Sequence, residues 1–181
     1  NGGRKATVFN LRTKVYQPPT GTGLINGKDT AGMNTVQASK LGIARTFQNI
    51  RLFDNMTVEE NVRIGLHNQI KYGMFSGIFR LPQYWQGEKK QHEKALDLLS
   101  IFGMENMGDV KAGSLPYGAQ RRLAIVRALA TNPSLLLLDE PAVGRTPHEP
   151  SALTETTIKI RNPFQIAILL IEHDMRSVMG I

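Results

Sequence analysis

The sequence lacks cysteine and has no long hydrophobic run. The absence of cysteine in the 181 residues excludes disulfides and thiolate metal sites, and it suits a reducing compartment. The apolar runs 135–138 and 166–171 have the length of a strand, far short of the roughly 20 residues that a membrane helix needs. A composition of 41% hydrophobic and 20% charged residues is typical of a folded chain, which excludes the disordered class.

The first 50 residues contain almost no acidic side chains. They carry seven Lys and Arg residues against Asp29 alone, whereas acids and bases nearly balance over the remainder. An excess of positive charge confined to one end indicates an anionic ligand there, either a phosphate group or nucleic acid. A solvated basic surface explains the charge equally well.

The chain also lacks an initiator Met and an apolar leader segment. It opens Asn1-Gly2-Gly3-Arg4-Lys5, inside what reads as a loop rather than a secretory signal. We therefore expect it to be a partial sequence.

Apolar periodicity and turn residues predict a mixed α/β chain. A hairpin is expected around Asn26-Gly27. A helix with a capping box is expected from Thr57, with Val58, Val62 and Leu66 on one face. Residues 71–87 read as an irregular connection. Further helices are predicted at 7–15, 88–102 (with Leu96, Leu99 and Phe102 inward), 119–130 (with Leu123, Val126 and Ala130 on one side) and 148–161.

Two apolar segments read as strands that are buried on both faces. Residues 135–138 and 166–171, with the predicted helix between them, form a β–α–β unit, and such a unit implies a parallel sheet. The first strand ends in Asp139 and Glu140, at the edge where open α/β sheets bind ligands. One acid can hold the water shell of Mg²⁺ and the next can polarise an attacking water. The alternative is a strand that simply ends in solvated acids.

The opening residues contain the parts of a phosphate cradle. Glycines, a lysine and a following helix supply close backbone approach, N–H donors and the positive end of a helix dipole. The segment does not satisfy G-x-x-x-x-G-K-[ST], because Arg4 precedes Lys5 and Ala6 follows it. By itself, this segment is only weak evidence for a phosphate-binding site.

Taken together, these motifs resemble the ATP-binding subunits of ABC transporters. Thr46-Phe47-Gln48 looks like the family's Q-loop, and residues 115–122 (LPYGAQRR) are similar to the signature segment. Residues 142–147 occupy the D-loop place, and 171–175 (IEHDM) match the switch-histidine segment. In amino-acid sequence, residues 42–53 and 170–175 are most similar to the bacterial branched-chain amino-acid importer ATPases.

The resemblance implies ATP and Mg²⁺ as ligands and assigns a role to each motif. Lys5 would contact the β- and γ-phosphates, and Gln48 and Asp139 would serve Mg²⁺. Glu140 would be the general base, and His173 would hold the γ-phosphate. The nucleotide-binding residues would be Asn1, Gly2, Gly3, Arg4, Lys5, Ala6 and Thr7. The residues that act in trans on the partner's ATP would be Pro116, Tyr117, Gly118 and Gln120.

The implied fold is a P-loop NTPase parallel-sheet core of the ABC ATPase type with an inserted α-helical subdomain, truncated at both ends. Residues 1–48 would be the first part of the core, 49–130 the helical subdomain ending in the signature helix, and 131–181 the second part of the core. The implied partners are a second ATPase subunit (identical or a paralogue), membrane permease subunits and, indirectly, a solute-binding protein. No nucleic acid is expected. The protein would be peripheral on the cytoplasmic face of the inner membrane.

Three departures from the family pattern bear on activity. Ala6 stands where the family has a Mg²⁺-binding hydroxyl, and Arg4 replaces a glycine of the phosphate loop. Pro116 replaces the signature serine and removes a backbone N–H donor.

The resemblance to the family therefore predicts that the chain is an ATP hydrolase, but these three residues predict a low hydrolysis rate. This leaves a catalytically degraded nucleotide-binding protein as the alternative. A DNA-repair-type ABC ATPase is a remote alternative, because the sequence between Lys5 and Asp139 contains no heptad run. A purely structural domain would make the motifs a coincidence.

Overall fold

The computed structural model describes residues 24–25, 27–29, 32–46, 51–67, 82–139, 160 and 164–171. The chain forms two compact units. One is built from Asn1–Gln48 together with Pro133–Ile181, and the other is Asn49–Asn132. We call the second the helical unit and describe each by itself. The predicted helices at 7–15 and 148–161 lie outside the described residues, except that Ile160 is helical and buried.

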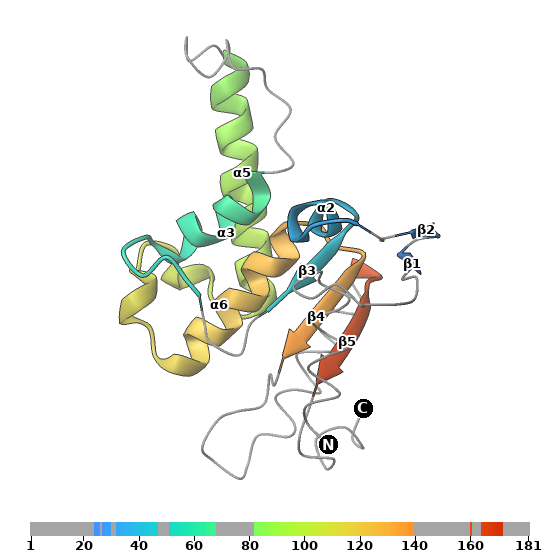
Figure 1. Cartoon of the computed structure of the whole chain (residues 1–181). Helices are drawn as coiled ribbons and strands as arrows, with labels where there is room; N and C mark the ends of the chain where they lie inside the picture. The colour runs from blue at the N-terminus through green and yellow to red at the C-terminus, as the bar shows by residue number, and fades with distance from the viewer. Residues whose placement is uncertain are drawn as a thin grey trace. The chain divides into compact units, whose positions relative to one another are not determined.

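The first unit contains a parallel sheet, as predicted. Strands β3 (Ile43–Arg45), β4 (Leu135–Asp139) and β5 (Ala167–Ile171) lie in the order β3-β4-β5 (Figure 1). Both pairings are parallel, with Arg45 opposite Leu137 and Asp139 opposite Ile171.

Burial differs between the two strands that were predicted from their apolar runs. Residues 136–138 of β4 are fully buried, which confirms that part of the prediction for the central strand. The second predicted strand is confirmed as β5, which begins one residue later than predicted. Its predicted burial on both faces is wrong, because Leu169 is 36% exposed. The strand β5 lies at the margin of the sheet formed by the described residues, so one of its edges has no neighbouring strand there.

Strand β3 was not predicted, because its three residues are too few to show a period. Its start is held against β4 at Gly42, whose carbonyl accepts hydrogen bonds from Ser134 N (2.7 Å) and Leu135 N (3.0 Å). A Cβ on Gly42 would lie 2.6 Å from Ser134 Oγ, and its φ of +92° favours glycine. Helix α2 (Thr35–Lys40) packs on β3.

The predicted hairpin is confirmed. Strands β1 (Leu24–Ile25) and β2 (Lys28–Asp29) pair antiparallel, with Leu24 opposite Asp29. Gly27, in the connection between them, has a φ of +74°, which is the left-handed conformation that a type I′ turn requires.

In the helical unit, α3 (Val58–Leu66) begins at the predicted capping box. Thr57 Oγ1 accepts from Glu60 N at 3.1 Å, and Glu60 Oε2 accepts from Thr57 N at 2.8 Å. Val58, Val62 and Leu66 are all buried, so the predicted apolar face is also confirmed.

Helix α5 (Pro82–Ile101) begins six residues earlier than predicted. Residues 82–87 fall in the stretch that was predicted to be an irregular connection, yet proline is compatible with the first helical position, where its missing N–H costs no hydrogen bond. The buried positions also differ, because Ala95 and Leu99 are fully buried whereas Leu96 is only partly so. Leu99 and Phe102 belong to the core as predicted.

Helix α5 is closed after Ile101 by a paired hydrogen-bond motif at Gly103, the residue that was predicted to stop it. Gly103 has a φ of +64°, its N–H donates to Ser100 O, and Met104 N donates to Leu99 O, both at 3.0 Å. This is the Schellman arrangement, and its usual hydrophobic contact is made here by Leu99 and Met104, both fully buried.

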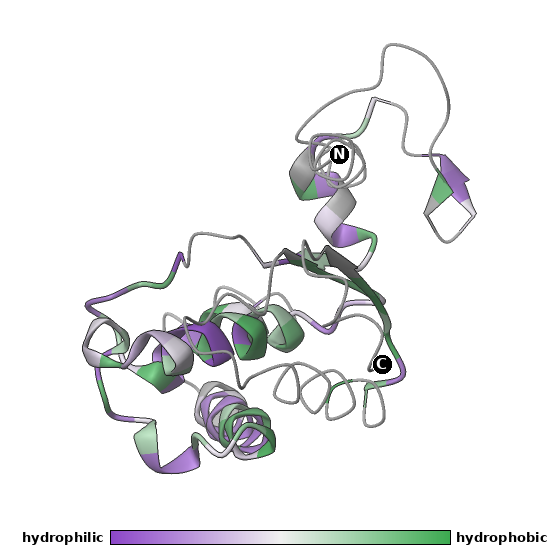
Figure 2. Ribbon diagram, turned by 90° about the horizontal axis from the view of Figure 1, so that it is seen from below, coloured by the Kyte–Doolittle hydropathy of each residue, from purple (hydrophilic) through white to green (hydrophobic). Residues whose placement is uncertain are grey.

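Two 3₁₀ turns, η2 (Glu105–Met107) and η3 (Ala112–Ser114), lead to helix α6 (Tyr117–Ala130). Helix α6 begins two residues earlier than predicted, and its predicted face of Leu123, Val126 and Ala130 is buried. Helices α3, α5 and α6 pack together, and the helices carry both hydrophilic and hydrophobic residues (Figure 2). Their shared core consists of Val58, Val62, Leu66, Ala95, Leu99, Met104, Ala112, Leu115, Ala119, Leu123, Val126 and Ala130.

A glycine sets the distance between α3 and α6. A Cβ on Gly65 would lie 2.5 Å from Arg127 O and 2.8 Å from Ala130 Cβ, closer than atoms can pack. The two helices therefore touch through the bare backbone at this point.

We expect Gly65→Ala to lower the free energy of unfolding of the helical unit by about 1–3 kcal/mol, because overpacking outweighs the gain of roughly 1 kcal/mol in helix propensity. Gly108→Ala is the matched control, since its Cβ would meet nothing closer than 3.8 Å. Denaturant unfolding measures both variants. Equal stability of the two would contradict the close contact.

Candidate functional site

The carboxyl ends of three adjacent parallel strands carry three of the predicted catalytic segments. Thr46 follows β3 and its N–H donates to Leu137 O at 2.9 Å, which keeps the chain beside β4 as it leaves the sheet. Because Asp139 pairs with Ile171, β4 and β5 end level with each other. In an open α/β sheet this edge is where ligands bind.

The sequence continues from each strand end directly into a predicted residue. Gln48 lies three residues after Arg45, Glu140 follows Asp139, and His173 lies two residues after Ile171. The backbone of Asp139 is part of β4. The other predicted residues of this region lie outside the described residues: Gln48, Glu140, His173 and the whole cradle segment Asn1, Gly2, Gly3, Arg4, Lys5, Ala6 and Thr7.

The predicted signature segment is fully described, and it forms the start of α6. Pro116 is the N-cap residue and makes no side-chain capping bond. Tyr117 is 53% exposed, and a Cβ on Gly118 would meet nothing within 4 Å. This end of the helix is therefore accessible to a ligand or a partner.

The first turn of α6 leaves backbone donors free. Pro116 O accepts from Ala119 N at 2.9 Å and from Gln120 N at 3.0 Å. Within the described residues, the N–H groups of Tyr117 and Gly118 donate to no acceptor. Free N–H groups at a helix N-terminus favour an anion such as phosphate. Proline has no N–H to add to them.

The side chain of Gln120 points back into its own chain. Its Nε2 donates to Leu115 O at 3.0 Å and to Gly113 O at 3.5 Å. Three of the four predicted signature residues thus lie together at the exposed helix start, and the fourth holds the loop behind it.

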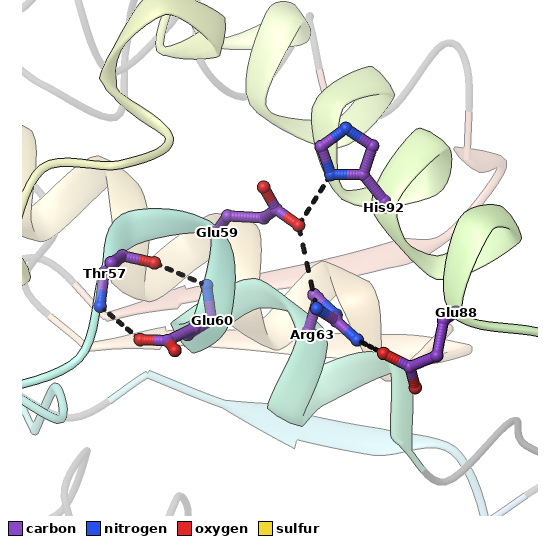
Figure 3. Close-up of polar contacts among 6 residues, drawn as sticks. All are labelled: Thr57, Glu59, Glu60, Arg63, Glu88 and His92. Carbon is purple, nitrogen blue, oxygen red and sulfur yellow. Dashed lines mark hydrogen bonds and ion pairs between the residues drawn. The ribbon is translucent and has the colours of Figure 1, made fainter. Parts of the chain in front are cut away.

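A polar cluster between α3 and α5 was not predicted. Glu59 Oε1 lies 2.8 Å from His92 Nδ1 and 3.9 Å from Arg63 Nη1, and Arg63 also pairs with Glu88 (Figure 3). The sequence signal was the four-residue spacing of Glu59 and Arg63 on one helix and of Glu88 and His92 on the other. Partly exposed pairs of this kind orient the helices more than they stabilise them.

Comparison with known proteins agrees with these motifs. Residues 1–143 match the ABC transporter family. The high-affinity branched-chain amino acid transport ATP-binding protein LivG of Escherichia coli K12 is 42% identical over all 181 residues, which span 71% of its length. The corresponding protein BraF of Pseudomonas aeruginosa is 39% identical over the same span.

Solved structures give the same result. An ATP-binding cassette of an ABC transporter in its ADP conformation aligns with a TM-score of 0.76 and 29% identity, covering 99% of this chain and 70% of that one. The resemblance inferred from the motifs and the P-loop NTPase fold are both confirmed. Because the family match spans most of the chain and the identity to LivG extends along all of it, the chain belongs to the ABC transporter family.

Proposed function

We propose that this chain is the ATP-binding part of an ABC importer and couples ATP binding and hydrolysis to the uptake of branched-chain or similar amino acids. The observation that carries the proposal is the shared carboxyl edge of β3, β4 and β5, from which Gln48, Glu140 and His173 follow in the sequence. The names of the relatives indicate the solute class.

At this edge the residue types suit a magnesium nucleotide. The carboxylate of Asp139 and the amide oxygen of Gln48 are oxygen donors of the kind that Mg²⁺ prefers. Bound Mg²⁺ would offset charge on the phosphates. Glu140 would accept a proton from the attacking water, His173 would hydrogen-bond the γ-phosphate, and Lys5 would hold the β- and γ-phosphates.

The exposed start of α6 is proposed to act on the ATP of a second ATPase subunit, identical or a paralogue. Its free N–H groups at Tyr117 and Gly118 provide the donors. Such donors stabilise charge that develops on a transferring phosphoryl group.

The helical unit is proposed to contact permease subunits on the cytoplasmic face of the inner membrane, with a solute-binding protein as an indirect partner. Its surface carries exposed apolar side chains close together in sequence, Phe53 and Met56. None of the helices in the described segments is both long and apolar enough to cross a membrane.

A second candidate function is nucleotide binding with degraded catalysis. Pro116 at the N-cap supplies neither a hydroxyl nor an N–H at the start of α6. Ala6 and Arg4 also depart from the family's phosphate loop.

For the experiments below, the completed chain is this sequence extended at both ends with the flanking segments of the E. coli relative. In it, we expect Glu140→Gln to lower ATP turnover roughly 100- to 10,000-fold, the contribution of a general base, while ATP-dependent dimerisation is retained. Glu93→Gln, which changes an exposed carboxylate of α5, is the control. Unchanged turnover in Glu140→Gln would remove this residue from the mechanism.

The three departures can be tested together. Restoring Arg4→Gly, Ala6→Thr and Pro116→Ser in the completed chain should raise Mg²⁺-ATP turnover by about a hundredfold or more, since one aimed donor alone contributes about 3 kcal/mol. If the unrestored chain already turns over ATP within a few-fold of the restored one, our interpretation of these positions is wrong.

Photo-cross-linkers placed at Phe53 and Met56 should capture the permease in membranes that contain the assembled transporter, because both side chains are exposed on the helical unit. Leu24, which is exposed on the β1–β2 hairpin, is the control and should give no permease adduct. A permease adduct from Leu24, with none from Phe53 or Met56, would refute this docking surface.

A further inference from the structure

Two segments of the helical unit that are far apart in sequence are joined through their backbones. We call residues 53–59 and 108–115 the paired segments. Thr57 and Lys111 form an antiparallel bridge. The remaining bonds are Val58 N to Val110 O (2.9 Å), Glu59 N to Gly108 O (3.0 Å), Ala112 N to Met56 O (2.9 Å) and Gly113 N to Asp54 O (3.1 Å).

The two segments approach each other most closely at Gly113. A Cβ there would lie 3.0 Å from Asp54 Cβ and 3.1 Å from Asp54 O, so the backbones are almost in contact. Any shift of the first segment must therefore move residues 112–115, which lead directly into α6.

The first of the paired segments is held by a buried amide. Asn61 on α3 is fully buried, and its Oδ1 accepts from Phe53 N at 3.0 Å. Its Nδ2 donates to Phe53 O at 3.1 Å and to Thr57 O at 2.9 Å. All three bonds fix the backbone of this segment against the helix, and an aliphatic side chain could replace none of them.

The second of the paired segments is held by the other amide, that of Gln120. Its bonds to Gly113 O and Leu115 O tie the first turn of α6 to the loop that precedes it. Glutamate, which has the same shape, cannot make them when ionised, because a carboxylate only accepts hydrogen bonds.

Helix α6 also contacts the first of the paired segments directly. The guanidinium carbon of Arg127 lies 5.6 Å from the centre of the Phe53 ring, within the range of a cation–π contact. Burial lowers the pKa of Arg127, but an arginine remains charged in proteins. Helix α6 is thus tied to the second of the paired segments near its start and to the first of them in its second half.

We propose that the side-chain amides of Asn61 and Gln120 are positioning groups for the exposed start of α6. They act through the paired segments and set where the N–H groups of Tyr117 and Gly118 lie. The proposal rests on the proposed function, in which these N–H groups reach the ATP of a second subunit. Donors displaced by even a small distance lose much of their effect on a developing charge.

The test uses the completed chain in the Arg4→Gly, Ala6→Thr, Pro116→Ser background, in which we expect the highest turnover. Gln120→Glu and Asn61→Ala are compared with Thr57→Ala, which removes a helix cap at a cost of about 1 kcal/mol but no side-chain amide. Steady-state kinetics give kcat and KM for Mg²⁺-ATP. Amide hydrogen exchange over residues 112–120 is measured in parallel and needs no activity.

We expect Gln120→Glu and Asn61→Ala each to lower kcat about tenfold, the equivalent of roughly 1.4 kcal/mol, with KM changed less than about twofold. Exchange over 112–118 should accelerate in both variants and stay unchanged in Thr57→Ala. The double variant should lose no more kcat than the worse single one, because both amides act through the same segments.

Three results would overturn the inference: wild-type kcat in Gln120→Glu, an equal loss of kcat in Thr57→Ala, or fully additive losses in the double variant. The parent protein of this test, which carries only the three restoring substitutions, could show no ATP turnover while exchange over 112–118 still accelerates in Gln120→Glu and Asn61→Ala. In that case the proposed function fails and the positioning of α6 by the two amides stands.

Discussion

Parallel pairing of β4 with both of its neighbours is the constraint on which the proposed catalytic edge depends. Strand β4 is buried through residues 136–138, so it can satisfy its backbone groups only by pairing on both sides. Because both partners run parallel to it, three chain segments leave the sheet at the same end. Gln48, Glu140 and His173 follow from that edge in sequence, and their roles stay predictions.

In the helical unit, the feature that must be positioned accurately is the start of helix α6. Its core is built from α3, α5 and α6 (Figure 1), and a hydrophobic core alone allows helices to slide or rotate by small amounts. Directional hydrogen bonds remove that freedom. The amide of Gln120 supplies such a bond where the signature segment begins, and the amide of Asn61 supplies others to the segment packed against it. The close contact at Gly113 limits the movement of the two segments further.

The departures from the family pattern are of two kinds. Arg4 and Ala6 differ from the family's phosphate-loop pattern in their side chains, whereas Pro116 also lacks the backbone N–H of the family's serine. The N-cap conformation of Pro116, with φ −56° and ψ 149°, lies within what proline adopts freely. The helix therefore forms normally with one donor fewer, and the effect of that missing donor on catalysis stays a prediction.

Local signals by themselves determined a large part of this protein. The capping box at Thr57, the turn at Gly27, the glycine stop of α5 and the apolar faces of α3 and α6 were all predictable, because each depends on residues within one or two turns. The family was also predictable, since its motifs have fixed spacing.

Only the tertiary structure decided the rest. The start of α5 at Pro82 and the partial exposure of β5 depend on which surfaces find a neighbour, and a sequence period does not state this. Gln120 was predicted to act on a partner, but its amide bonds to Gly113 and Leu115. Those acceptors are carbonyl groups that every residue carries, so nothing in the sequence marks them before the chain has folded.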